Sequence, residues 1–126
     1  MNDSVNINRK IALKILNEFS NAFNIPLKIG NIDKLAKKML IIIDKANDED
    51  DRINRETNVV NALSFYLGDE LISKNGGEWF VNDEGEYSVV LKNNTKLYPF
   101  TKVRKFLENG DPDSLVAFFT TASIFG

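Results

Sequence analysis

The 126 residues contain neither cysteine nor histidine. Without cysteine the chain can form no disulfide, no thiolate nucleophile and no cysteine-bound metal centre. Without histidine it lacks the usual general base near neutral pH and the commonest transition-metal ligand. We therefore expect no catalytic residues, no metal site and no cofactor, and a protein that acts by surface complementarity.

A strong charge of one sign and a long apolar run are also missing. The net charge of −2 gives no electrostatic reason to expect a nucleic-acid partner. The longest apolar run, Met39 to Ile43, is far shorter than the roughly 20 residues that cross a bilayer. Met1 to Ser4 contain no basic segment followed by an apolar one, so we expect no signal peptide. We expect neither nucleic acid nor membrane as a partner, and a cytoplasmic location, which the lack of cysteine also favours.

What is present is typical of one soluble domain. A chain of 126 residues with 43% hydrophobic residues can bury a core of its own, so residues 1–126 are predicted to form a single domain. The charge is uneven along the chain, with +4 over residues 1–46 and −5 over residues 47–70. These two segments either mark opposite poles of the molecule or neutralise each other in space.

The first half of the chain predicts three helices. Residues 3–23 form the first, with Asp3 or Ser4 as its cap and one apolar stripe at three- and four-residue spacing. The stripe comprises Ile11, Ile15, Leu16, Phe19 and Phe23. Pro26 ends this helix, and a second runs from about residue 32 to residue 46.

The third helix has more than one possible start and a single predicted end. Residues 47–51 read as a connection, and the regular helix is predicted to begin at Thr57 or Asn58, or after Asn54 as cap. Its apolar band is broad, which is typical of a central helix touched on several sides. Gly68 inside it indicates close packing against another element, and residues 76–77 end it.

The second half predicts a three-stranded antiparallel β-meander followed by two helices. The meander begins at Glu78-Trp79-Phe80 and ends at Leu97-Tyr98-Pro99, and Trp79 and Phe80 point to opposite faces. A fourth helix ends at residues 109–110, and a fifth opens with Asp111 as cap and Pro112 at its first position. The fold class is α+β, with three N-terminal helices, the meander, and two C-terminal helices that cover one sheet face.

Several charged clusters could form a metal-binding or catalytic site, and each also has a structural explanation. Asp48, Glu49, Asp50 and Asp51 are contiguous and lack the central glycine of a calcium loop, so a solvated connection is favoured over a metal site. The acids near Gly85 are typical of a hairpin tip. Lysines of the second helix favour a solvated face. Glu70, Glu78 and Glu108 are conceivable catalytic acids, but no spacing singles them out.

One run of motifs resembles a group of small uncharacterised bacterial domains. These share the order LGE, GG-x-W, PF-x-KV, NG and DSL. The chain matches it over about residues 63–119, beginning with Leu67-Gly68-Asp69, where aspartate replaces glutamate, and ending with Asp113-Ser114-Leu115. The motifs are caps, turns and packing positions, so the resemblance implies a fold more than an activity. Domains of this kind are associated with toxin immunity and defence.

The sequence therefore predicts a non-catalytic protein-binding module, most specifically an immunity or inhibitor protein. The predicted contact residues are Trp79, Tyr87, Tyr98 and the acidic residues 48–51. A second copy of the chain is an alternative partner. The alternative function is a small-ligand binder or carboxylate-based enzyme with a site near the meander. The apolar Ile124-Phe125 at the C-terminus packs either on the domain or on a partner.

Overall fold

The structure is a computed structural model that describes residues 3–125 and the side chains of residues 5–124. Its elements, in chain order, are α1 (Asp3–Phe23), η1 (Ile29–Asn31), α2 (Ile32–Asp44), α3 (Glu49–Asn75), β1 (Gly77–Val81), β2 (Tyr87–Leu91), β3 (Lys96–Leu97), α4 (Pro99–Asn109), η2 (Asp111–Asp113) and α5 (Leu115–Phe125). The predicted α+β class is confirmed. The side chains of Asp3 and Ser4, expected to cap α1, lie outside the described part.

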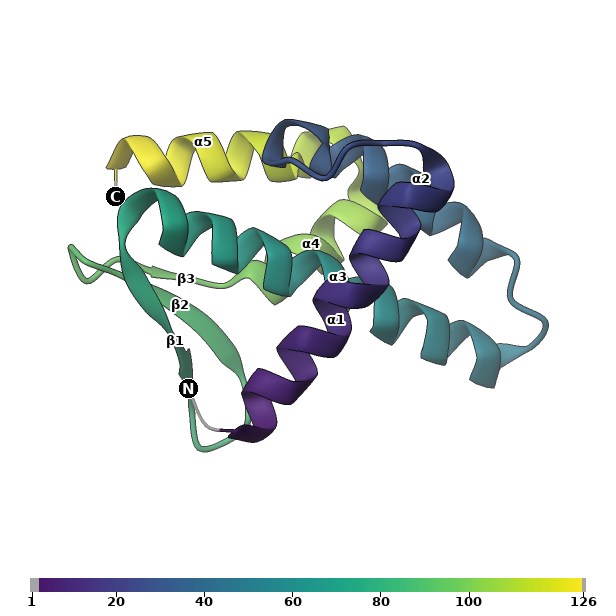
Figure 1. The fold of residues 1–126 in the computed structure, drawn as a ribbon, viewed down its shortest axis with the longest axis horizontal. Helices are drawn as coiled ribbons and strands as arrows, with labels where there is room; N and C mark the ends of the chain where they lie inside the picture. Colours follow the sequence, from purple (N-terminus) through teal and green to yellow (C-terminus); the bar gives the residue numbers. More distant parts are fainter. Residues whose placement is uncertain (1–2, 126) are drawn as a thin grey trace.

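Helix α3 is the centre of the molecule. It packs against α1, α2, α4, α5 and two strands of the sheet, and Figure 1 shows it running through the middle of the fold with α5 alongside. Its middle is buried on all sides, because even Ser64 and Gly68 are inaccessible to solvent. The broad apolar band had predicted this position. Within residues 3–125, no helix has both the length and the apolar character needed to cross a bilayer.

The predicted start of α3 is wrong. The helix begins at Glu49, with Asp48 as its cap, whose side chain accepts a hydrogen bond from the Asp51 amide at 2.8 Å. The acidic residues read as a connection are therefore the cap and first turn of the helix. Carboxylates at this place are stabilised by the unpaired amides and the positive end of the helix dipole.

The sheet has the order β1-β2-β3 with antiparallel pairing, as the meander predicts. Trp79 pairs with Val89, and both side chains are buried against the helices. Phe80 lies on the other face and is 46% exposed. The opposite orientations expected for Trp79 and Phe80 are confirmed.

The last helix differs from the prediction in two ways. Residues 111–113 form a 3-10 turn, and α5 begins only at Leu115. It packs mainly on α3 and α2, whereas α4 and α3 cover the sheet. The reason is Asp33 of α2, whose Oδ1 accepts from the amides of Leu115 and Val116 at 2.7 and 3.3 Å. A cap supplied from a distant helix ties the start of α5 to α2.

Candidate functional site

Four hollows lie beside α3, where α1, α2, α4 and the β1–β2 turn pack against it, and neighbouring hollows share lining residues. Asn61 lines two of them, Arg104 lines three, and Glu56 is shared by two. We call this surface the α3 groove and define it by Ile11, Ile53, Glu56, Asn58, Asn61 and Arg104. Its hollows have volumes between about 120 and 340 Å³. An elongated and open shape is the result.

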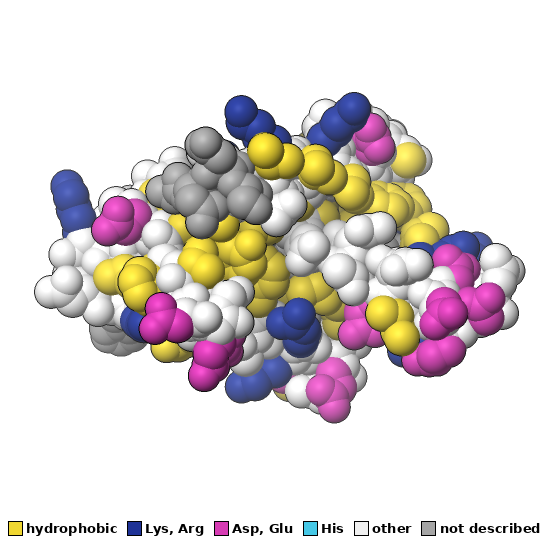
Figure 2. Space-filling model, turned by 90° about the horizontal axis from the view of Figure 1, so that it is seen from below, with side chains coloured by type: hydrophobic (Ala, Val, Ile, Leu, Met, Phe, Trp, Pro, Cys, Tyr) yellow, Lys and Arg dark blue, Asp and Glu magenta, His cyan; other side chains and the backbone are white. Residues whose placement is uncertain are grey.

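The α3 groove is lined by both apolar and polar side chains. Figure 2 shows hydrophobic side chains in the middle of the face seen from below, and acidic side chains gathered at the end where α2 joins α3. Ile11 and Ile53 are 54% and 52% exposed. Isolated exposed apolar residues are ordinary, and these two line different hollows of the groove.

Ile11 departs from the predicted apolar stripe of α1. The stripe placed it with Leu16, but Leu16 is fully buried whereas Ile11 faces the groove. The small side chain of Ala12, 3% exposed, lies within the contact of α1 with the core. The stripe is therefore wider than the buried surface of α1, and its edge becomes part of the groove.

The two predicted tyrosines lie at one end of the groove. Tyr87 and Tyr98 line the same hollow, of about 260 Å³, together with Phe100 and Arg104. Tyr87 is half-buried and stacks on Phe100, with ring centroids 5.1 Å apart. Tyr98 is 50% exposed. The structure thus brings Tyr87 and Tyr98 together and leaves Tyr98 the more accessible of the two.

Trp79 is placed differently. Its ring is 8% exposed and lies edge-on to Phe65. Its indole N–H donates to Asp69 Oδ1 at 3.0 Å, and Asp69 also pairs with Arg9 of α1 at 2.8 Å. This arrangement joins β1, α3 and α1. A buried ring with a satisfied N–H holds these elements together and presents little surface to a partner.

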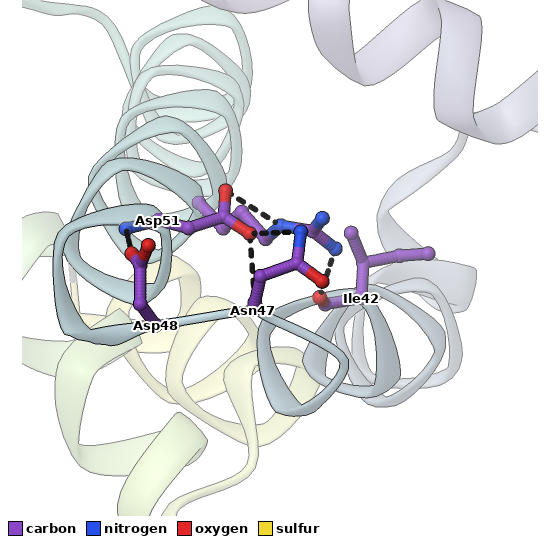
Figure 3. A network of polar contacts seen from close by, with 5 residues as sticks. Ile42, Asn47, Asp48 and Asp51 are labelled. Atoms are coloured by element: carbon purple, nitrogen blue, oxygen red, sulfur yellow. Dashed lines mark hydrogen bonds and ion pairs between the residues drawn. The ribbon is translucent and has the colours of Figure 1, made fainter.

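The acidic residues 48–51 divide into two kinds. Asp51 accepts from the Asn47 amide at 3.0 Å and from Arg55 at 3.1 Å, and Arg55 also donates to the Ile42 carbonyl at 2.8 Å. Figure 3 shows Asn47, Asp48, Asp51 and Ile42 in this network. The hydrogen bond from Asn47 and then the one from Arg55 lower the pKa of Asp51. Asp48 and Asp51 therefore have structural roles, whereas Glu49 and Asp50 are exposed.

Of the conceivable catalytic acids, Glu108 lines the hollow of about 340 Å³ together with Glu56, and both side chains are exposed. Among the acidic side chains of the described residues, no group of three is close enough to hold a metal ion. Glu78 is exposed and lines none of the four hollows of the groove. Glu86 does line the hollow at Tyr98, but its hydrogen bond with Asn82 lowers the pKa of its carboxyl. A general acid would need a pKa raised towards neutrality.

Sequence reasoning missed most of the groove. Asn58, Asn61 and Arg104 are polar residues that no sequence pattern connects, and only the packing of α1 and α4 on α3 gives them a common surface. The exposed C-terminal residue Ile124, at 71% exposure, lies on none of the groove's hollows, and the Phe125 side chain is outside the described part.

Comparison of the chain with protein-family models, with curated proteins and with solved structures finds no match.

Proposed function

We propose that this protein acts by binding another protein, without catalysis, through the α3 groove. The sharper form of the proposal is an immunity or inhibitor protein, which the resemblance in residues 63–119 favours. In this role the groove receives an elongated segment of the partner. Tyr87 and Tyr98 contact that segment at one end, and Glu49 and Asp50 lie near the other.

The observation that carries the proposal is that neighbouring hollows beside α3 share lining residues. Four hollows joined through Asn61, Glu56 and Arg104 suit a helix or an extended peptide, because such a segment places side chains at regular intervals along its length. Arginine and tyrosine are also among the residues that contribute most to protein interfaces.

A small-ligand site near the meander is the second candidate, and of the groove's four hollows only the one at Tyr87 and Tyr98 is lined by a strand residue. Its volume of about 260 Å³ falls just below the range of about 300–1,000 Å³ usual for ligand pockets. The acid beside it, Glu86, is exposed, and its pKa is lowered. An enclosed cavity and a buried acid would favour this alternative. The hollow is only partly enclosed, and its acid is exposed.

Affinity capture from the native host, followed by mass spectrometry, tests the proposal. The tagged wild-type protein should retain one partner in stoichiometric amount. Ile53→Asp and Asn58→Arg place charge or bulk in the groove at exposed positions, so both should fold normally and retain less than about a tenth of that partner. Circular dichroism checks the fold of each variant.

Ile41→Asp is the matched control, because Ile41 is similarly exposed, at 46%, and lines none of the groove's hollows. It should capture the partner as the wild type does. Equal capture by Ile53→Asp would move the contact surface elsewhere. Recovery of no partner, together with turnover of a small substrate, would overturn the proposal. Light scattering across concentration identifies a second copy of the chain as the partner if the mass doubles.

A further inference from the structure

A further hollow, beyond the four of the α3 groove, also includes Tyr98 in its lining and lies between β3, α4 and α5. We call it the lysine hollow and define it by Lys96, Leu97, Tyr98, Lys102, Lys105 and Phe118. Its volume is about 210 Å³, which is small for a ligand pocket, where about 300–1,000 Å³ is usual. The space suits one large side chain that is held by a longer segment outside.

The floor of this hollow is apolar. Leu97 and Phe118 are half-buried and pack against the core, and Tyr98 adds a half-exposed ring. These side chains come from β3, from the residue between β3 and α4, and from α5, so the floor is held by the tertiary structure and does not depend on a single loop. Such a floor favours an apolar, and best an aromatic, side chain as its occupant.

The rim of the hollow is positively charged. Lys102 Nζ lies 3.1 Å from Asp113 Oδ1 and 5.9 Å from the centroid of the Phe118 ring. Lys96 Nζ lies 4.8 Å from the centroid of the Phe80 ring. Among the described residues, neither Lys96 nor Lys105 forms a salt bridge. Three lysines thus line the hollow; the Lys102 ammonium is paired with Asp113, and the Lys96 ammonium lies over Phe80, which is outside the hollow.

We infer that the lysine hollow binds an acidic segment of a protein partner that inserts one aromatic side chain. The inserted ring fills the apolar floor, and carboxylates on both sides of it pair with Lys96 and Lys105. The inference rests on the proposed function only in that the segment belongs to a protein. Nucleic acid fits less well, because the chain has a net charge of −2 and a nucleic-acid site generally shows a broader basic field.

A synthetic peptide tests the inference without the natural partner. The probe is a fluorescein-labelled heptapeptide with one phenylalanine between two groups of three glutamates, and binding to the full chain is followed by fluorescence anisotropy. A second peptide has serine in place of phenylalanine, and a labelled oligothymidylate of seven nucleotides serves as the nucleic-acid arm. Binding is measured at about 50 and about 300 mM salt, because exposed ion pairs are screened at the higher value.

We expect saturable binding of the phenylalanine peptide, about tenfold weaker binding of the serine peptide, and a clear weakening at high salt. Lys105→Glu and Lys96→Glu should each weaken binding of the phenylalanine peptide about tenfold, because rim charges of a binding site govern attraction of the ligand. Lys38→Glu is the matched control, since Lys38 is an exposed lysine of α2 outside the hollow. It should leave binding unchanged.

Three results would overturn the inference. They are undetectable binding of the phenylalanine peptide at low salt, equal binding of both peptides, and tighter binding of oligothymidylate. Equal weakening by Lys38→Glu would have the same effect, because attraction would then be general. Ile53→Asp separates the two proposals. It should bind the peptide as the wild type does, so loss of partner capture and loss of peptide binding report on different surfaces.

Discussion

At the level of single residues, the contact of Gly68 with Trp79 decides how the sheet meets α3. A Cβ atom built on Gly68 would lie 2.1 Å from Trp79 Cζ2. The ring cannot move away easily, because its N–H is bonded to Asp69 and its edge meets Phe65. The glycine expected to mark a close approach therefore does so, and its partner is the only tryptophan of the chain.

Gly68→Ala should lower the free energy of unfolding by about 3 kcal/mol, the upper part of the range for overpacked cores. Urea unfolding followed by circular dichroism measures the change. Gly30→Ala is the control, because no atom lies within 4 Å of a Cβ built on Gly30, and its effect should stay within about 0.5 kcal/mol. Equal effects of the two substitutions would mean that Trp79 does not pack on Gly68.

At the level of elements, the start of α3 depends on the acids that precede and begin it. Asp48 caps the helix. Asp51 accepts hydrogen bonds from Asn47 and Arg55, and Arg55 also donates to the Ile42 carbonyl in the last turn of α2. These contacts fix the angle between α2 and α3 (Figure 3). The acidic segment is thus a joint between two helices, and its two exposed acids, Glu49 and Asp50, are the ones open to a partner.

The joint should make stability depend on pH. The pKa of Asp51 is lowered in the folded state, so the unfolded chain binds a proton more readily at this residue. Its contribution is then complete above the ordinary aspartate pKa of about 3.9 and is lost as the pH falls through the lowered folded value. Asp51→Asn should be less stable than the wild type at pH 7, with the difference shrinking towards pH 3.

Urea unfolding at several pH values checks this expectation. Asp83→Asn is the control, because Asp83 is an exposed residue of the β1–β2 turn, and its small effect should not vary with pH in this way. A constant difference between the wild type and Asp51→Asn from pH 7 to pH 3 would contradict the assigned role.

At the level of the whole molecule, α3 connects every other part. It contacts the four other α-helices, β1 and β2, so no element outside it forms a separate core (Figure 1). Leu63, Leu67 and Leu71 along it are fully buried. Helices and sheet should therefore lose their structure together, as in a small two-state domain.

Leu67→Ala should lower the free energy of unfolding by about 2–5 kcal/mol, the usual loss for a buried leucine. Trp79 fluorescence reports on the sheet and far-ultraviolet circular dichroism on the helices, and both midpoints should fall together. Leu107→Ala, at a half-buried position of α4, should cost less. An earlier midpoint for Trp79 fluorescence would show that the sheet separates from α3 before the helices unfold.

Predictions from the sequence succeeded where the determining contacts are local. The turn at Asn93-Asn94 includes a residue with positive φ, 70° at Asn94, which asparagine tolerates better than most residues. Gly110 closes α4 as expected. The start of α3 is one local feature that the sequence prediction gets wrong. Residues 48–51 are predicted as a solvated connection, but they form the cap and first turn of the helix.

The binding surfaces were less predictable. Tyr87 and Tyr98 were chosen as aromatic residues near the sheet, and the structure places both on one hollow. Nothing in the sequence joins Asn58 to Arg104 or Lys96 to Phe118, because these residues belong to elements that meet only after folding. Whether the predicted residues bind a partner stays a prediction until capture is measured.

The amino-acid sequence alone determined the fold class, the order of helices and strands, and the lack of thiol and imidazole groups. These follow from residue chemistry and from periodicity over a few neighbours. Only the tertiary structure decided that Asp33 caps α5, that Trp79 packs on Gly68, and that two hollows flank Tyr98. Each of these depends on the distance between residues far apart in the chain, which is set by how complementary helix and sheet surfaces pack.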